Sequence, residues 1–251
     1  MQMKKAMAYM FVSATVMVYG EALEAVTITN ATTNTVVFDS AGFENDTPGT
    51  AASAASPGFW SNGAATHDFV VTGGAPGAYE GSNYMSTTRD FLGAGNVRAF
   101  VSPAESTPGD TIHAEWMMYI THPPLSDIGF FFTNPANTNI GQVRIGGNGL
   151  GTIQDSWSGT ITSNAYQAGV WQKWELDYTI GNANWTVSVD GGTPISFIVP
   201  GGAANATGFE HLSFVHNGNQ TFYLDSVPEP ATAGVLGAFG LAALARRKRL
   251  N

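Results

Sequence analysis

Strict alternation of apolar and polar residues is the feature that most limits what this chain can form. In residues 111–121 the even-numbered positions are apolar, and polar Thr, His and Glu stand between the first of them. The same period of two runs through residues 171–180 and 185–189, which Gly181-Asn182 separates. Successive side chains of a strand point to opposite faces of a sheet, so each run predicts a strand with one buried and one solvated face. The Gly-containing step between the last two predicts a hairpin turn.

Further strands are predicted wherever short β-forming runs lie between turn residues. They are residues 35–39, 68–72, 83–88, 97–101, 128–133, 142–145, 195–199, 211–216 and 221–225. The chain has 30 Gly and 12 Pro, only 12% of its residues are charged, and its middle lacks sustained helix-forming runs. About a dozen strands in about 200 residues predict an all-β, antiparallel jelly-roll sandwich of two packed sheets. We expect one domain at residues 26–226, with residues 47–61 as a long loop.

The N-terminal 25 residues have the order of parts found in a secretory signal peptide. Lys4 and Lys5 precede an uncharged, largely apolar run at residues 6–20, and small residues then allow cleavage after Ala22 or Ala25. The run is short for a membrane span. We therefore predict that residues 1–25 are an export signal, read by the export machinery.

The C-terminal segment, residues 227–251, also has three parts in order. Val227-Pro228-Glu229-Pro230 ends the last strand, because proline cannot donate to a β-ladder. Residues 231–245 are small and apolar, and a helix of that length reaches about 22 Å at about 1.5 Å per residue. The final part is a basic stop: Arg246, Arg247, Lys248 and Arg249. The basic cluster should stay in the cytoplasm, so a short transmembrane helix with its C-terminus inside is predicted.

This three-part end resembles the PEP-CTERM sorting signal: a Pro-Glu-Pro motif, a short transmembrane helix and an arginine-rich terminus. The resemblance implies processing near Pro228-Glu229-Pro230 by an exosortase. It also implies an exported protein at the cell envelope, cell surface or extracellular matrix of a Gram-negative type of bacterium, often one that makes exopolysaccharide or biofilm. The alternative is a plain tail anchor with a chance Pro-Glu-Pro.

Charge and cysteine content exclude several classes of function. Residues 26–226 hold four basic residues against 16 acidic ones, a net charge of −12. Such a surface repels phosphate backbones, so we expect no nucleic-acid partner. The chain has no cysteine, which excludes thiol nucleophiles, zinc–thiolate sites and iron–sulfur clusters.

A second resemblance, to concanavalin A-like and laminin-G-like domains, rests on four segments. They are the opening at residues 43–49, the strand at 171–177, the hairpin at 187–191 and the closing strand at 222–225. It implies a β-sandwich whose functions range from glycan binding and adhesion to polysaccharide cleavage.

No catalytic constellation is found. Hydrolases of this fold often carry Glu-x-Asp-x-x-Glu on one strand; Glu175 and Asp177 supply the first two positions, but the third is Ile180. The five histidines form no His-Glu-x-x-His pattern, although His113 could pair with an acid on a neighbouring strand. We therefore expect no enzymatic activity.

Two kinds of binding residue remain as candidates. Calcium could bind Asp39, Glu44, Asp46 and Asp225 if the first and last strands are neighbours. A glycan could stack on Tyr119, Trp157, Trp171 and Tyr223, which stand off the core faces or in loops. No other cofactor is expected.

Three functions remain open after these observations. The first is a surface or matrix protein whose sandwich binds or scaffolds extracellular polysaccharide. The second is a purely structural surface protein without a specific ligand, and the third is a polysaccharide hydrolase or lyase with a degenerate motif.

The tail is predicted to be a processing signal, because the prolines keep residues 228–230 extended and accessible just outside the apolar run. With a C-terminal epitope tag in the native host, the wild type should lose the tag. A variant with Pro228→Ala and Pro230→Ala should keep it on an immunoblot. A mature wild-type protein that still carries the tag at full length would leave only tail anchoring.

Overall fold

The computed structural model describes the central part of the chain. The described residues are 26–44, 46–50, 59–61, 68–88, 95–121, 128–146, 152–155, 159, 161–162, 165–216 and 221–225. The predicted export signal and the predicted sorting segment lie outside these residues. Within them the helices are three-residue 3-10 turns, η1 (Ala41–Phe43), η2 (Pro103–Glu105) and η3 (Gly202–Ala204). None of these turns could cross a bilayer.

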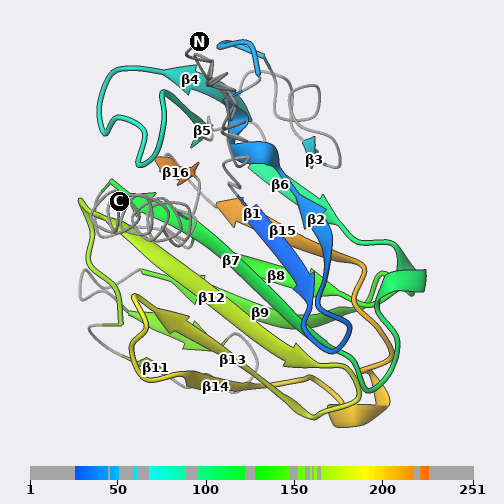
Figure 1. The fold of residues 1–251 in the computed structure, drawn as a ribbon. Helices are drawn as coiled ribbons and strands as arrows, with labels where there is room; N and C mark the ends of the chain where they lie inside the picture. Colours follow the sequence, from blue (N-terminus) through cyan, green and yellow to red (C-terminus); the bar gives the residue numbers. More distant parts are fainter. Residues whose placement is uncertain are drawn as a thin grey trace, which may run out of the picture.

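Two antiparallel sheets form the described domain (Figure 1). The nine-stranded sheet has the order β14-β13-β12-β7-β16-β5-β4, and the β1–β2 hairpin joins it at β7. Its strands are β1 (Val26–Asn30), β2 (Thr35–Asp39), β4 (Asp68–Thr72), β5 (Asn83–Thr88), β7 (Thr111–Ile120), β12 (Trp171–Thr179), β13 (Asn184–Val189), β14 (Ile195–Ile198) and β16 (Thr221–Asp225).

The second sheet has seven strands in the order β11-β10-β9-β8-β15-β6-β3. They are β3 (Phe59–Ser61), β6 (Gly95–Phe100), β8 (Ile128–Thr133), β9 (Asn139–Ile145), β10 (Ile153–Asp155), β11 (Ile161–Thr162) and β15 (His211–His216). Every strand pair in both sheets is antiparallel. The predicted all-β antiparallel sandwich is therefore confirmed.

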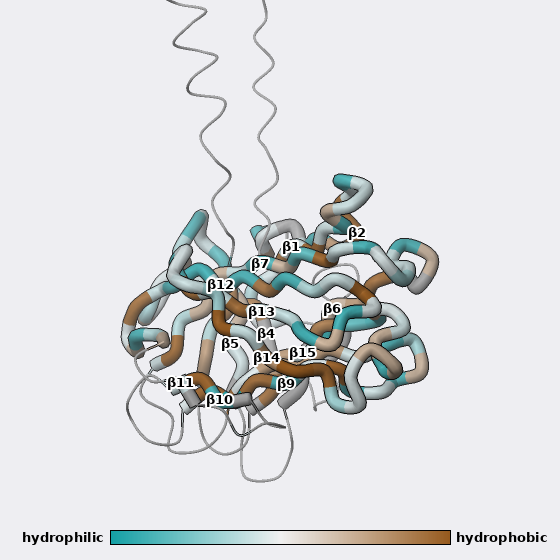
Figure 2. Tube along the Cα trace, turned by 90° about the horizontal axis from the view of Figure 1, so that it is seen from below, coloured by the Kyte–Doolittle hydropathy of each residue, from teal (hydrophilic) through white to brown (hydrophobic). Residues whose placement is uncertain are grey.

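Alternation along the strands builds the core between the sheets. In β7 the even-numbered residues from Ile112 to Ile120 are buried, and Trp174, Leu176 and Tyr178 of β12 join them. Hydropathy changes repeatedly along the individual strands in Figure 2. Trp116 packs edge-on against two rings of the other sheet, Phe130 at 5.1 Å and Phe214 at 5.3 Å between centroids. Aromatic contacts of this kind join the two layers.

The first and last described strands, β1 and β16, pair end to end with the same edge of β7. Strand β16 pairs with the C-terminal part of β7, and Asp225 lies opposite Met117. Strand β1 pairs with the N-terminal part, and Val26 lies opposite Trp116. Both strands run antiparallel to β7, so the end of β16 meets the start of β1. The first and last described strands are thus neighbours along β7, which was the condition set for the calcium candidates, although β1 itself was not predicted.

The structure corrects the predicted strands at several places. Residues 59–61, expected inside a long loop, form the short strand β3 on the edge of the second sheet. Strands β1, β10 and β11 were not predicted. Strand β1 alternates in sequence but is buried almost throughout, and it has only five residues; the other two have only three and two residues.

Close packing at Gly141 generates a stability prediction. Gly141 lies opposite Phe132, and a Cβ at Gly141 would stand 2.0 Å from Cε1 of that ring. The ring cannot easily yield, because it also packs at 4.9 Å from Trp185 and 5.4 Å from Phe209. Gly141→Ala should therefore lower the free energy of unfolding by about 1–3 kcal/mol.

Urea unfolding followed by circular dichroism measures this change. Ser196→Ala, on the exposed side of edge strand β14, is the control and should change stability by less than about 0.5 kcal/mol. Equal stability of Gly141→Ala and the wild type would contradict the packing account.

Candidate functional site

The outer face of the nine-stranded sheet carries a row of paired side chains between β7 and β12. Each pair joins residues that lie directly opposite in the register, and alternate positions share this face. In order along β7 the pairs are Thr111–Thr179, His113–Asp177, Glu115–Glu175, Met117–Lys173 and Tyr119–Trp171. We call this row the ladder.

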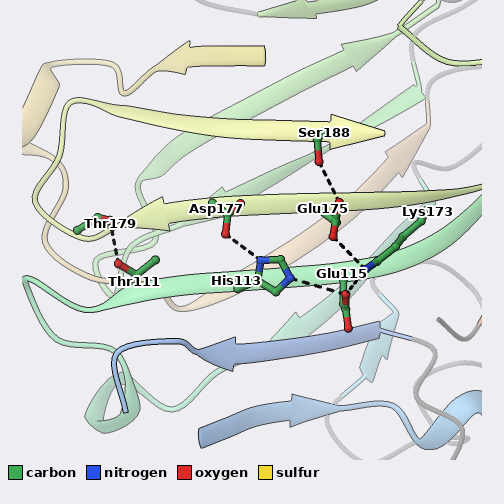
Figure 3. Close-up of polar contacts among 8 residues, drawn as sticks. All are labelled: Thr111, His113, Glu115, Lys173, Glu175, Asp177, Thr179 and Ser188. Atoms are coloured by element: carbon green, nitrogen blue, oxygen red, sulfur yellow. Dashed lines mark hydrogen bonds and ion pairs between the residues drawn. The ribbon is translucent and has the colours of Figure 1, made fainter. Parts of the chain in front are cut away.

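Charged residues occupy the middle of the ladder (Figure 3). The Nδ1 atom of His113 lies 2.8 Å from Oδ1 of Asp177, and its Nε2 atom lies 3.7 Å from Oε2 of Glu115. The ammonium of Lys173 lies 2.7 Å from Oε2 of Glu115 and 2.9 Å from Oε1 of Glu175. These five residues, the charged cluster, thus form one connected network. Ser188 of β13 extends it by donating to Glu175 at 3.0 Å.

The network fixes the ionisation states of three of its members, His113, Glu115 and Lys173. Hydrogen bonding to Asp177, and then the nearby carboxylate of Glu115, raises the pKa of His113 from its ordinary 6.5 to about 9. The neighbouring imidazolium of His113 outweighs burial and, together with Lys173, lowers the pKa of Glu115 to about 2. Burial opposes the charged form of Lys173, but Glu115 and Glu175 still raise its pKa. At neutral pH the cluster therefore contains an imidazolium, an ammonium and an ionised Glu115.

Three of these residues could also offer ligands to a metal ion. One ligand atom each from His113, Glu115 and Glu175 lies within 4.8 Å of the other two. The ammonium of Lys173 already contacts both glutamates, so a metal ion would have to displace it. His113 pairs with Asp177 on the neighbouring strand β12, a pairing that the sequence analysis had left open. The sequence did not show that Glu115 stands beside Glu175, because their strands are far apart in the chain.

Three of the four predicted glycan-stacking residues stand in one row. Trp171 lies opposite Tyr119, and Tyr119 lies opposite Tyr223 of β16. Their ring centroids are 5.6 Å apart for Tyr119 and Trp171 and 6.0 Å apart for Tyr119 and Tyr223. All three side chains are half-buried. The fourth predicted residue, Trp157, lies outside the described residues.

Two tyrosines that were not predicted complete this aromatic cluster. Tyr84 of β5 packs 5.4 Å from Tyr223 and 6.3 Å from Trp171. Tyr79, in the loop of residues 73–82 between β4 and β5, packs 6.2 Å from Trp171 and is 44% exposed. The same loop accepts a hydrogen bond from Nε1 of Trp171 at Gly77 (3.2 Å) and one from the Tyr84 hydroxyl at Gly73 (2.9 Å). Tyr84 lies in a predicted strand, but the sequence does not show that this strand, β5, pairs with β16 and so brings Tyr84 close to Tyr223.

The four acids predicted as calcium ligands lie at different places. Asp39 is in β2, and Asp46 lies just after η1. The carboxylates of Glu44 and Asp225 accept hydrogen bonds from backbone amides of residues 79–83. Among the described residues, no three of these acids bring ligand atoms together. Calcium binding here stays a prediction.

The raised pKa of His113 has a consequence for stability. A histidine whose folded pKa exceeds its unfolded pKa stabilises the fold fully below about pH 6.5, and this contribution is lost as the pH rises through about 9. The free energy of unfolding of the wild type should therefore fall over this range more steeply than that of His113→Gln.

Urea unfolding at pH 6, 7.5 and 9 tests the slope. Between pH 7.5 and 9, His211→Asn is the matched control: burial lowers the folded pKa of His211 from 6.5 to about 4, so this histidine is neutral in both the folded and the unfolded chain over that interval. The control should keep the wild-type slope, and an unchanged slope in His113→Gln would contradict the network's role.

Comparison with known proteins identifies the C-terminal segment. Residues 226–249 match the PEP-CTERM protein-sorting motif. This motif indicates an exported protein that is associated with the cell envelope of Gram-negative bacteria, and it implies processing by an exosortase. No curated protein matches the sequence at a significant level.

Solved structures that are similar to this chain have low sequence identity. A sialidase is 9% identical with a TM-score of 0.48; the match covers 64% of this chain but only 16% of the sialidase. A Bacteroides ovatus mixed-linkage glucan GH16 protein is 15% identical with a TM-score of 0.43, covering 64% of this chain and 84% of that one. Lectin II from Ulex europaeus is 11% identical with a TM-score of 0.43, covering 73% and 96%. The chain thus combines an antiparallel β-sandwich with a C-terminal PEP-CTERM sorting motif.

Proposed function

We propose that this exported protein binds extracellular polysaccharide at the cell surface or in the matrix, through the outer face of its nine-stranded sheet. The observation that carries the proposal is the row of Trp171, Tyr119 and Tyr223 at one end of a polar ladder. Sugar-binding sites combine apolar surface with a few well-placed polar groups, and this face offers both. The export and sorting implied by the C-terminal motif would place the domain where such polymers occur.

The aromatic cluster supplies the apolar part of the proposed site. Indole and phenol rings give large contact areas together with polar tips that can hydrogen-bond. Trp171 and Tyr119 are held by neighbouring rings, so little side-chain freedom would be lost on binding.

The ladder supplies the polar part and gives the site its length. From Tyr119 to Thr111 the strand covers about 27 Å at about 3.4 Å per residue. Hydroxyl, imidazolium, carboxylate and ammonium groups follow one another along this distance. A track of this length suits a polymer better than a single sugar.

The charge of the domain favours a neutral polymer. The net charge of −12 over residues 26–226 repels polyanions. Within the charged cluster, the cations His113 and Lys173 are already paired with carboxylates. Neither cation is therefore left to attract the acidic groups of a uronic-acid polymer.

Binding without cleavage is proposed because the Glu-x-Asp-x-x-Glu pattern ends at Ile180 and because Glu115, the central carboxyl group of the cluster, is poorly suited to acid catalysis. Glycoside hydrolysis needs a carboxylic acid that remains protonated near neutral pH. Glu115 is held in the opposite state, since its pKa is lowered to about 2. We therefore propose that the domain releases no sugar from the polymer it binds.

Affinity electrophoresis on neutral, acidic and amino-sugar polysaccharides tests the proposal, with a reducing-sugar assay on the same samples. We expect retention on a neutral polymer and no release of reducing ends. Trp171→Ala should weaken binding at least tenfold, because truncating a central aromatic residue typically costs about 2 kcal/mol or more.

Phe100→Ala is the matched control for this experiment. Phe100 is 38% exposed and lies on β6 of the other sheet, so its loss should leave binding unchanged. A melting curve checks that both variants fold. Absence of retention on every polymer would favour a purely structural surface protein, and release of reducing ends would favour a hydrolase.

A further inference from the structure

The loop of residues 73–82 carries the most exposed ring of the aromatic cluster. Tyr79 is 44% exposed, whereas Tyr84 of the same cluster is only 2% exposed. The Tyr79 ring packs on Trp171, which also donates to Gly77 of the same loop. The position of this loop therefore decides whether Tyr79 and Trp171 form one surface.

A buried carboxylate binds the backbone of the loop at Tyr79 and Glu80. Asp225, the last residue of β16, is fully buried. Its Oδ2 atom accepts hydrogen bonds from the backbone amides of Tyr79 and Glu80, the second at 3.2 Å. Hydrogen bonds to an ionised acceptor are stronger than those between neutral groups.

A second carboxylate holds the end of the loop. Oε1 of Glu44 accepts from the amides of Ser82 at 2.8 Å and Asn83 at 2.7 Å. Gly81 lies between the two amide pairs with φ of +65°, and a Cβ there would stand 2.4 Å from the same Glu44 oxygen. Four of the five amides from Tyr79 to Asn83 thus donate to two carboxylates that come from opposite ends of the domain sequence.

We propose that Asp225 is a positioning residue for the glycan-binding face: it fixes the backbone at Tyr79 so that this ring completes the surface formed with Trp171. The inference rests on the proposed function, and it assigns to Asp225 no contact with the ligand. Asp225 directly precedes the matched sorting segment at residues 226–249. Asp225 therefore both precedes the sorting segment and holds the loop of residues 73–82 in place.

Two variants of the full-length protein separate the anchor from the ring. Asp225→Asn keeps the shape of the side chain but removes its charge. It should speed hydrogen exchange at the Tyr79 and Glu80 amides at least tenfold and weaken binding of the neutral polymer at least tenfold. Tyr79→Ala should weaken binding to a similar extent while exchange at residue 80 stays as in the wild type.

Glu80→Gln is the control, because it alters a side chain of the same loop and leaves both backbone donors to Asp225 in place. It should change neither exchange nor binding. Hydrogen exchange is measured by NMR, and the exchange rates of the β7 amides show whether each variant keeps its fold.

Unchanged exchange at residues 79 and 80 in Asp225→Asn would overturn the inference, and so would faster exchange in that variant with wild-type affinity. Wild-type affinity of Tyr79→Ala would overturn it as well. A wild type that binds no polysaccharide refutes the proposed function instead, and the exchange data then still show whether Asp225 anchors the loop.

Discussion

Strand β7 lies between β12 on one side and β1 with β16 on the other, and the alternation of its ten residues determines both faces of the sheet. Its even-numbered side chains, centred on Trp116, fill the core. Its odd-numbered side chains begin with Thr111 and end with Tyr119 on the outer face. A one-residue slip against β12 would bury His113 and Glu115 and would expose Trp116. Core packing therefore enforces the register that brings Glu115 beside Glu175 and Tyr119 beside Trp171.

The sequence was most informative where one strand face is solvated. Strands β2, β4, β5, β8, β15 and β16 begin and end at the predicted residues, and β7 and β12 differ from prediction only at their last residue. Strand β1 was missed although Val26-Thr27-Ile28-Thr29 alternates, because it has only five residues and directly follows the predicted export signal. The short strands β3 and β10 have three residues each, too few for a period to be recognised.

In the candidate site, too, the sequence indicated which side chains leave the core but not which residues they meet. Parity within one strand placed Tyr119, Trp171 and Tyr223 off the core, and the structure joins them in a row. The odd or even position of a residue within its strand does not show which strands are neighbours. The contact of Lys173 with Glu115 could therefore not be predicted from the sequence. The acids Glu44 and Asp225 were singled out as oxygen donors. The structure gives their oxygens backbone amides as partners, a role that no residue pattern distinguishes from metal binding.

The end-to-end pairing of β16 and β1 along β7 also means that the described domain closes on itself. Asp225 and Val26 pair with adjacent residues of β7, so a very short linker would join them into a ring without moving either strand. Closing such a gap restrains the unfolded chain and leaves the sheet unchanged. New ends could then be opened at an exposed turn such as Gly191-Gly192, where the backbone reverses between β13 and β14. The order in which the strands follow one another along the chain could therefore change while their arrangement in the sheet stays the same. Strands β16 and β1 lie end to end along β7, and the only break between them is the place where the described domain begins and ends.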